Sequence, residues 1–127
     1  MTSEEKARLA AAAAEDLKAT QIVVLDVEGQ THIADFFVIC SGTSDTHIRA
    51  IADSVIEKLQ ENGAGKPRRE GVQAAQWVLL DYDDVVVHVF SAEQREFYNL
   101  ESFWSGARVL ELTEEARGQR QPAAAAA

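Results

Sequence analysis

The stretch that decides the fold is WVLLDYDDVVVHVF, residues 77–90. Two apolar halves rich in β-branched residues flank an acidic centre, a pattern that predicts two strands joined by a tight turn. With Tyr82 and Asp83 at the centre of the turn, Trp77 would face His88 across the hairpin. The other expected pairs are Leu79 with Val86, Val78 with Val87, and Leu80 with Val85. Trp77, His88, Leu79 and Val86 would then share one side of the sheet.

An aromatic segment, REFYNLESFW at residues 95–104, follows the hairpin closely. The hairpin and this segment together hold both tryptophans, both tyrosines and three of the five phenylalanines. Apolar residues at helical spacing predict a short helix with Phe97, Leu100 and Trp104 on one face and Tyr98 turned aside. A helix of this length cannot bury all these rings and also cover the hairpin. We therefore expect some rings to pack in the core and others to form a protein-binding face.

The composition narrows the class of protein. The chain has 127 residues, of which 46% are hydrophobic, and this suits one domain with a real core. Its 21 acidic residues outnumber 12 basic residues, for a formal net charge of −9. This charge argues against direct, non-specific nucleic-acid binding, which depends on cationic side chains neutralising phosphates, and favours a basic protein partner. The one basic cluster, KPRR at residues 66–69, is interpreted as a solvated loop.

Cysteine content and hydropathy indicate the compartment. Cys40 is the single cysteine, which excludes an intrachain disulfide and a cysteine-based zinc site. Its apolar neighbours favour burial as a small hydrophobic side chain. No apolar run approaches the length of a membrane span, and the acidic amino-terminal segment is unlike a signal or transit peptide. We therefore expect a cytoplasmic protein without membrane contact.

The first half of the chain predicts a helix followed by two strands. A capping box of Thr2 and Glu5 begins a helix expected over residues 3–19, with a narrow apolar stripe of Leu9, Ala13 and Leu17. Strands are expected over residues 22–27 and 36–40. The second of these is apolar on both faces and therefore central in the sheet.

A second helix is expected to begin at the N-cap Ser44 and to end at Asn62-Gly63. Two weaker strands are expected at residues 68–70 and 107–112. Residues 113–127 are interpreted as a disordered tail. The predicted fold class is α/β (α+β): a single domain over residues 1–112 with a mixed β-sheet flanked by helices.

Two loops carry candidate chemistry. The loop SGTS at residues 41–44 lies between a strand and a helix, where helix N-termini bind phosphate, but it lacks the signatures of nucleotide-binding loops. Asp81, Asp83 and Asp84 have the chemistry to hold a divalent metal, and the spacing of the first two is that of the nucleotidyltransferase metal pair. Aspartate is also favoured in turns, and we interpret all three as turn residues.

The histidines give no metal site by spacing, since no pair has the i, i+4 arrangement of a helical site. His88 has the chemistry to act as a base for Ser41 or Cys40. Nothing in the sequence places these side chains together. A position opposite Trp77 favours a stacking or interface role, and no metal or cofactor is expected.

Six motifs in chain order resemble one known family. They are DFFVICSGTS at 35–44, IAD at 51–53, EG at 70–71, WVLLDY at 77–82, DVVVHVF at 84–90, and REFYNLE with Trp104 at 95–104. The chain is similar over about residues 5–105 to the ribosomal silencing factor family, also called the iojap or RsfS family. The resemblance implies a small fold related to nucleotidyltransferases but without their catalytic machinery.

The resemblance also implies a function and a partner. It implies a translation repressor, not an enzyme, that binds the universal large-subunit protein L fourteen and blocks joining of the small subunit in starvation or stationary phase. For organelle relatives it implies roles in large-subunit assembly. It makes a homodimer plausible. The residues that match the family's partner-contacting face are Trp77, Asp81, Asp84, His88, Tyr98 and Leu100.

Two other hypotheses remain open at this point. A divergent nucleotidyltransferase would use Ser41, Asp81 and Asp83 and would bind a nucleotide with metal. A self-associating domain would use its aromatic face to close a homodimer.

Overall fold

The computed structural model describes residues 1–110 and 112, and the tail predicted for residues 113–127 lies outside this range. The elements, in order, are α1 (Ser3–Asp16), β1 (Thr20–Asp26), β2 (Phe36–Gly42), α2 (Asp45–Glu61), β3 (Arg68–Glu70), β4 (Trp77–Asp81), β5 (Val85–Ser91), α3 (Ala92–Tyr98), α4 (Leu100–Phe103) and β6 (Arg108–Val109).

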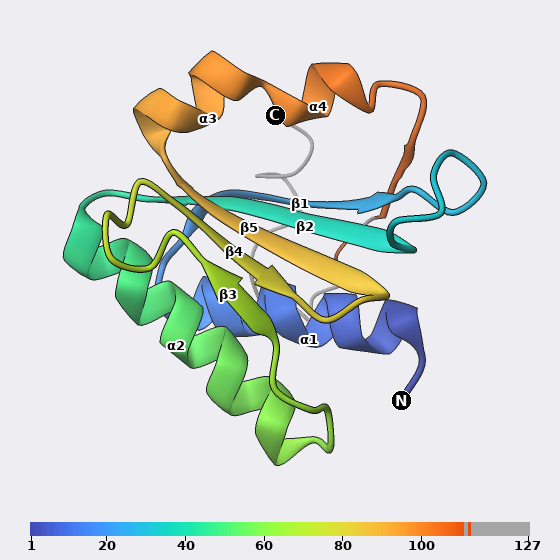
Figure 1. The fold of residues 1–127 in the computed structure, drawn as a ribbon, viewed down its shortest axis with the longest axis horizontal. Helices are drawn as coiled ribbons and strands as arrows, with labels where there is room; N and C mark the ends of the chain where they lie inside the picture. Colours follow the sequence, from blue (N-terminus) through green and yellow to red (C-terminus); the bar gives the residue numbers. More distant parts are fainter. Residues whose placement is uncertain (111, 113–127) are drawn as a thin grey trace.

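The strands form one mixed sheet in the order β3-β4-β5-β2-β1-β6. β2 and β5 are parallel, while every other neighbouring pair is antiparallel. Helices α1 and α2 cover one face of the sheet, and α3 and α4 lie over the other (Figure 1). Every residue of β2 is buried, as expected of a central strand. The predicted class, a single domain with a mixed sheet flanked by helices, is confirmed.

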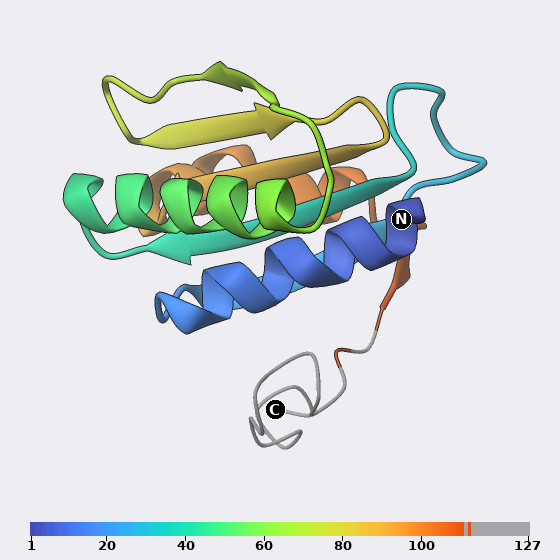
Figure 2. The ribbon, with the colours of Figure 1, turned by 90° about the horizontal axis from the view of Figure 1, so that it is seen from below.

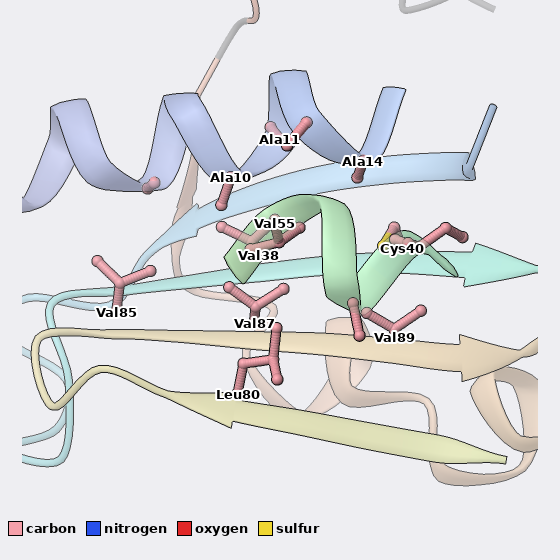
Figure 3. Packing of buried hydrophobic residues seen from close by; sticks show 14 of the residues in the cluster. Ala10, Ala11, Ala14, Val38, Cys40, Val55, Leu80, Val85, Val87 and Val89 are labelled. Atoms are coloured by element: carbon pink, nitrogen blue, oxygen red, sulfur yellow. The ribbon is translucent and has the colours of Figure 1, made fainter. Parts of the chain in front are cut away.

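The core between the sheet and the two long helices depends on alanine. The predicted capping box of Thr2 and Glu5 is present, but α1 ends at Asp16 and only Ala13 of the predicted stripe is fully buried. Leu9 and Leu17 are only partly buried. The fully buried positions of α1 are instead alanines, namely Ala7, Ala10, Ala11, Ala13 and Ala14. Because alanine is small, α1 lies close against β1, β2 and α2, as Figures 2 and 3 show.

The second helix agrees with the sequence prediction. Ser44 caps α2 by accepting a hydrogen bond from the backbone N–H of His47, and the helix ends at Asn62. Its apolar face is buried against the sheet, and its members are Ile48, Ile51, Val55 and Leu59. Cys40, on β2 beneath this helix, is fully buried as expected.

The predicted register of the β4–β5 hairpin is wrong by two residues. Trp77 pairs with Phe90 and Leu79 pairs with His88. The turn therefore consists of Asp83 and Asp84, and not of Tyr82 and Asp83. Because side chains alternate with a period of two, a shift of two residues leaves the predicted faces unchanged.

The turn chemistry explains the shift. The backbone N–H of Tyr82 donates to the carbonyl of Val85 at 2.9 Å, so the ladder continues past the end of β4. The N–H of Asp84 then donates to the carbonyl of Tyr82 at 2.9 Å, which closes a three-residue turn around Asp83. Asp83 has φ of 74°, a conformation that aspartate tolerates better than most residues. Tyr82 stays in the strand direction because its ring is buried in the core.

The predicted aromatic helix is two helices, α3 and α4, separated by Asn99. Asn99 has φ of 47° and ψ of 56°, the left-handed conformation that ends helices and that asparagine adopts readily. The break removes Phe97 from the face that it was predicted to share with Leu100 and Trp104. Phe97 is 77% exposed. Leu100 and Trp104 instead pack against the buried apolar residues on the side of the sheet that α3 and α4 cover.

Gly71, in the connection between β3 and β4, lies close to the backbone of Trp77. It has φ of 79°, and a Cβ atom added there would overlap the backbone carbonyl oxygen of Trp77. Gly29 has a similar φ of 83° but open space around the same position. We expect Gly29→Ala to cost about 1 kcal/mol of unfolding free energy from backbone strain. Gly71→Ala should cost about 1–3 kcal/mol more, because the β3–β4 connection must also shift.

Urea unfolding of the two variants and the parent protein measures both losses. Equal losses in the two variants would show that the close approach of Gly71 to the carbonyl oxygen of Trp77 does not affect stability.

Candidate protein-binding face

The structure gathers an aromatic cluster on the side of the sheet covered by α3 and α4. We define it as Phe37, Trp77, His88, Phe90 and Tyr98. The ring of Trp77 lies 4.7 Å from Tyr98, 4.8 Å from Phe90 and 6.0 Å from His88, measured between centroids. The alternation along β4 and β5 puts Trp77, His88 and Phe90 on this side, and α3 brings Tyr98 over them. Tyr98 is 47% exposed and Trp77 is partly exposed, so the cluster has a solvent-facing edge.

His88 supports Trp77 from below. It is 5% exposed, and its Nδ1 atom accepts a hydrogen bond from Nε1–H of Trp77 at 3.1 Å. The proton of the neutral ring therefore sits on Nε2, which is buried and has no hydrogen-bond partner among the residues the structure describes. Burial lowers the pKa of His88 to about 4, against a smaller opposing effect of the Asp81 charge. His88 is thus uncharged at neutral pH and fixes the orientation of the indole.

Leu100 and Trp104 complete the base of this surface. Leu100 begins α4 and packs on the same apolar cluster as Trp77. Trp104 lies edge-on against Phe37 at 5.3 Å between centroids. These contacts hold α4 on the sheet beside the aromatic cluster.

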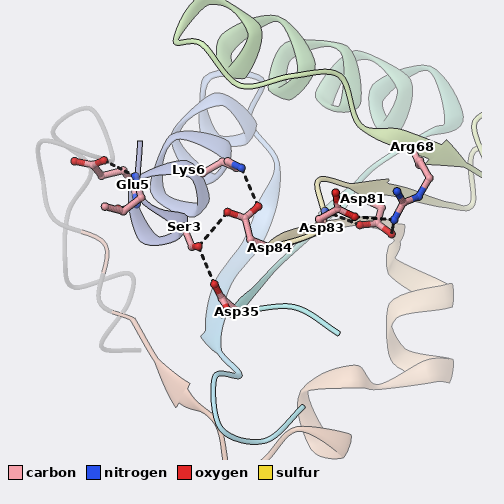
Figure 4. Close-up of polar contacts among 9 residues, drawn as sticks. Ser3, Glu5, Lys6, Asp35, Arg68, Asp81, Asp83 and Asp84 are labelled. Atoms are coloured by element: carbon pink, nitrogen blue, oxygen red, sulfur yellow. Dashed lines mark hydrogen bonds and ion pairs between the residues drawn. The ribbon is translucent and has the colours of Figure 1, made fainter. Parts of the chain in front are cut away.

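Acidic groups border the cluster at the hairpin end. Asp81 lies on β4 on the same side as Trp77, and its carboxylate accepts from Arg68 at 2.8 Å. Asp83 accepts from the same guanidinium at 3.0 Å. Arg68 comes from the edge strand β3 and is exposed, so this charge network is open to solvent (Figure 4).

Asp84 lies apart from the other residues of the predicted face. Its carboxylate forms an ion pair with Lys6 at 2.8 Å and accepts from the Ser3 hydroxyl at 3.0 Å. The same hydroxyl lies 2.8 Å from Asp35, and its single proton serves one carboxylate at a time. Burial alone would raise the pKa of Asp84, but the hydrogen bonds from Lys6 and Ser3 outweigh it and lower the pKa. Asp84 therefore anchors the start of α1, and its carboxylate lies toward Lys6 and Ser3, away from the Arg68 network (Figure 4).

The residues of the nucleotidyltransferase hypothesis are not brought together. Ser41 pairs with Phe90 across β5, whereas Asp81 pairs with Val86 at the other end of that strand. At the rise of a β-strand these levels are about 13 Å apart. The Ser41 hydroxyl accepts a hydrogen bond from Arg95 at 3.1 Å. Within residues 1–110 and 112, no three metal-ligating side chains form a group that could hold an ion.

Two exposed phenylalanines were missed as surface residues. Phe97 of α3 and Phe103 of α4 are 77% and 76% exposed. Each lies edge-on against a neighbouring ring, Phe97 against Tyr98 at 5.0 Å and Phe103 against Trp104 at 5.2 Å. Helical periodicity alone hides them, because it assumes one continuous helix. The signal that could have revealed them is Asn99, a residue favoured at left-handed helix ends.

No helix in the described part of the chain is long and apolar enough to cross a bilayer.

The chain is similar to known proteins along its length. A family model described as "Ribosomal silencing factor during starvation" matches residues 1–127. The chain is 46% identical over 112 residues to the ribosomal silencing factor RsfS of Halalkalibacterium halodurans, covering 88% of this chain and 96% of that protein. It is 43% identical over 112 residues to RsfS of Bacillus subtilis, covering 88% and 95%.

Solved structures share the fold. A crystal structure of a protein from Chromobacterium violaceum aligns with a TM-score of 0.80 at 36% identity, covering 83% of this chain and 88% of that one. A crystal structure of a protein from Bacillus halodurans aligns with a TM-score of 0.75 at 43% identity, covering 86% and 99%.

The buried state of His88 predicts a pH effect on stability. The unfolded chain binds a proton at this residue below about pH 6.5, whereas the folded protein resists protonation down to about pH 4. The stabilising contribution is therefore complete above about pH 6.5 and is lost as the pH falls toward about 4, by about 3 kcal/mol in total. In His88→Gln this group no longer titrates, and the amide oxygen can still accept from Trp77.

We expect the unfolding free energy of the parent, taken relative to that of His88→Gln, to fall by about 3 kcal/mol from about pH 7.5 to about pH 4. Denaturant unfolding at several pH values measures it, and carboxylates common to both proteins cancel. Parallel stability curves would contradict burial of a neutral His88.

The separate position of Asp84 predicts a structural role. Asp84→Asn should lower the unfolding free energy by about 1 kcal/mol, because the ion pair with Lys6 is partly shielded from water. Asp83→Asn is the matched control at the neighbouring position, where the side chain is 81% exposed and the expected change is close to zero. Thermal or urea unfolding measures both, and equal effects would contradict the anchoring role of Asp84.

Proposed function

Since the chain belongs to the ribosomal silencing factor family, we propose that it represses translation by binding the large ribosomal subunit through ribosomal protein L fourteen. In this position it sterically blocks joining of the small subunit and lowers translation in starvation or stationary phase. The site of action is the cytoplasm, where subunits meet.

The observation that carries the proposal is the contact of Trp77 with Tyr98, whose ring centroids lie 4.7 Å apart at an interplanar angle of 46°. The pair has an exposed edge above a buried base of His88 and Phe90. Large rings held in place lose little side-chain freedom when a partner binds. Such aromatic anchors commonly carry most of the binding energy of an interface. The proposed contact surface is Trp77, Asp81, Tyr98 and Leu100, with His88 acting through Trp77.

Charge supports a protein contact over an RNA contact. The chain carries a formal net charge of −9, which phosphate backbones repel. Asp81 and Asp83 lie at the rim of the aromatic cluster, where they can meet cationic side chains of a basic ribosomal protein. Rim charges of this kind set orientation and association rate more than affinity.

Steric exclusion requires only that a folded domain occupy the intersubunit face of the large subunit. A domain of this length has a radius of gyration of about 13 Å, so its presence on the intersubunit face prevents close contact there. The mechanism needs no catalytic group, in keeping with the separation of Ser41 from Asp81.

Co-sedimentation with isolated large subunits, small subunits and joined ribosomes tests the function. We expect binding to large subunits alone, and fewer joined particles when the protein is added before the small subunit. Binding of the isolated protein L fourteen tests the partner separately. Absence of large-subunit binding would contradict the function, and binding without loss of joined particles would contradict the steric mechanism.

Single substitutions test the face. Trp77→Ala and Tyr98→Ala should each weaken large-subunit binding by more than about 1 kcal/mol, because each removes one of the two rings of the aromatic anchor. Ile33→Ala is the control, since Ile33 is an apolar residue on the β1–β2 loop, outside the aromatic cluster, and is 71% exposed. Circular dichroism confirms that each variant is folded before its dissociation constant is measured. Full affinity in folded Trp77→Ala and Tyr98→Ala would eliminate this face.

A further inference from the structure

Arg95 is a buried cation that joins three elements. It lies on α3, is 6% exposed, and donates through Nη1 to the Ser41 hydroxyl of β2 at 3.1 Å. Its Nε and Nη2 atoms donate to one carboxylate oxygen of Glu101, on α4, at 3.2 and 2.6 Å. A buried guanidinium is costly unless its donors are paired. These partners satisfy both ends of the guanidinium fork and give it one defined orientation.

The ion pair spans the break between the two short helices. Asn99 separates α3 from α4 in a left-handed conformation, and Glu101, two residues after it, is the ion-pair partner of Arg95. Tyr98 lies immediately before the break, one helical turn after Arg95. Holding Arg95 to Glu101 and to the sheet therefore fixes the backbone from which Tyr98 projects onto Trp77.

Other contacts hold this region less directly. α4 is a single turn, and none of its residues is fully buried. Leu100 and Trp104 pack on the apolar cluster, but apolar contacts do not by themselves define one backbone angle at Asn99. An ion pair in which two guanidinium donors converge on one carboxylate oxygen has a narrow geometry and does so. Without it, we expect α3 and α4 to sample several relative orientations.

We propose that Arg95, paired with Glu101 and seated on Ser41, is a positioning residue that holds Tyr98 on Trp77 and so preforms the binding face, a role that deepens and rests on the proposed function. Preforming the face avoids an ordering cost during association, and this gain appears as affinity. Arg95 itself is buried and need not touch the partner.

The first test uses Arg95→Met, which keeps the length of the side chain and removes its charge and donors. Glu101 keeps access to water in this variant because its side chain is 34% exposed. The protein is labelled with 5-fluorotryptophan, and its two tryptophans give two fluorine resonances, assigned with Trp77→Phe. We expect the Trp77 resonance of Arg95→Met to shift or broaden, because the Tyr98 ring no longer lies over it.

Two further readouts separate positioning from general loss of structure. Amide hydrogen exchange in residues 92–104 should accelerate at least tenfold, while exchange in β2 and β5 stays at the parent rate. The dissociation constant for large subunits should rise at least tenfold. Arg108→Met is the matched control, because Arg108 forms an exposed ion pair with Asp26 at the far edge of the sheet. It should change none of these measurements.

Glu101→Gln keeps the test decisive if Arg95→Met does not fold. Its side chain is the same size and is partly exposed, so we expect a folded protein with a smaller change in the same direction in all three readouts. Combining Arg95→Met with Glu101→Gln should add little to Arg95→Met alone, because both remove one interaction. Independent, additive effects would contradict the pair.

An unchanged Trp77 resonance with parent-like exchange in a folded variant would overturn the proposal. Faster amide exchange in residues 92–104 with an unchanged dissociation constant for large subunits would also overturn it. If the parent protein itself does not bind large subunits, the proposed function fails. The fluorine and exchange results then decide by themselves whether Arg95 holds Tyr98 on Trp77.

Discussion

The parallel pairing of β2 with β5 is the constraint on which the rest of the structure depends. Seven consecutive residue pairs join the two strands, from Phe36 with Val85 to Gly42 with Ser91. Both strands are buried on both faces, and so each supplies an apolar surface to two separate layers. One layer is closed by the alanine face of α1 and by α2. The other is closed only by two short helices, which leaves room for an exposed aromatic edge.

The difference between the two layers separates stability from binding. On the α1 and α2 side the small, fully buried residues pack densely, and the ion pair of Asp84 with Lys6 locks the start of α1. On the other side the rings are large, and a short α3 and α4 cover them incompletely. An incompletely covered aromatic surface supported by a rigid sheet has the physical properties of a protein-binding face. The proposed function uses this second layer.

Sequence patterns predicted most of this architecture. β-branched runs identified the central strands, and the caps at Thr2 and Ser44 located the starts of both long helices, because these signals act over a few residues. The hairpin faces were also predicted correctly, although the register was wrong by two residues. Placement of the turn depended on whether Tyr82 stayed in the strand. Its burial against the core decided this, and no local signal contains that information.

The candidate face was predictable only in part. The sequence by itself predicted that Trp77 and His88 share one side of a hairpin, since alternation requires this in the predicted register and in any register shifted from it by two residues. Tertiary structure decided that Tyr98 lies over Trp77, that Phe97 faces solvent, and that Asp84 serves α1. The physical reason is that the positions of Tyr98 and Phe97 depend on the backbone angle at Asn99 and on the buried pair of Arg95 with Glu101. Asp84 meets Lys6 and Ser3 only when α1 packs against the sheet. Such contacts between separate elements form only once the sheet and helices are packed.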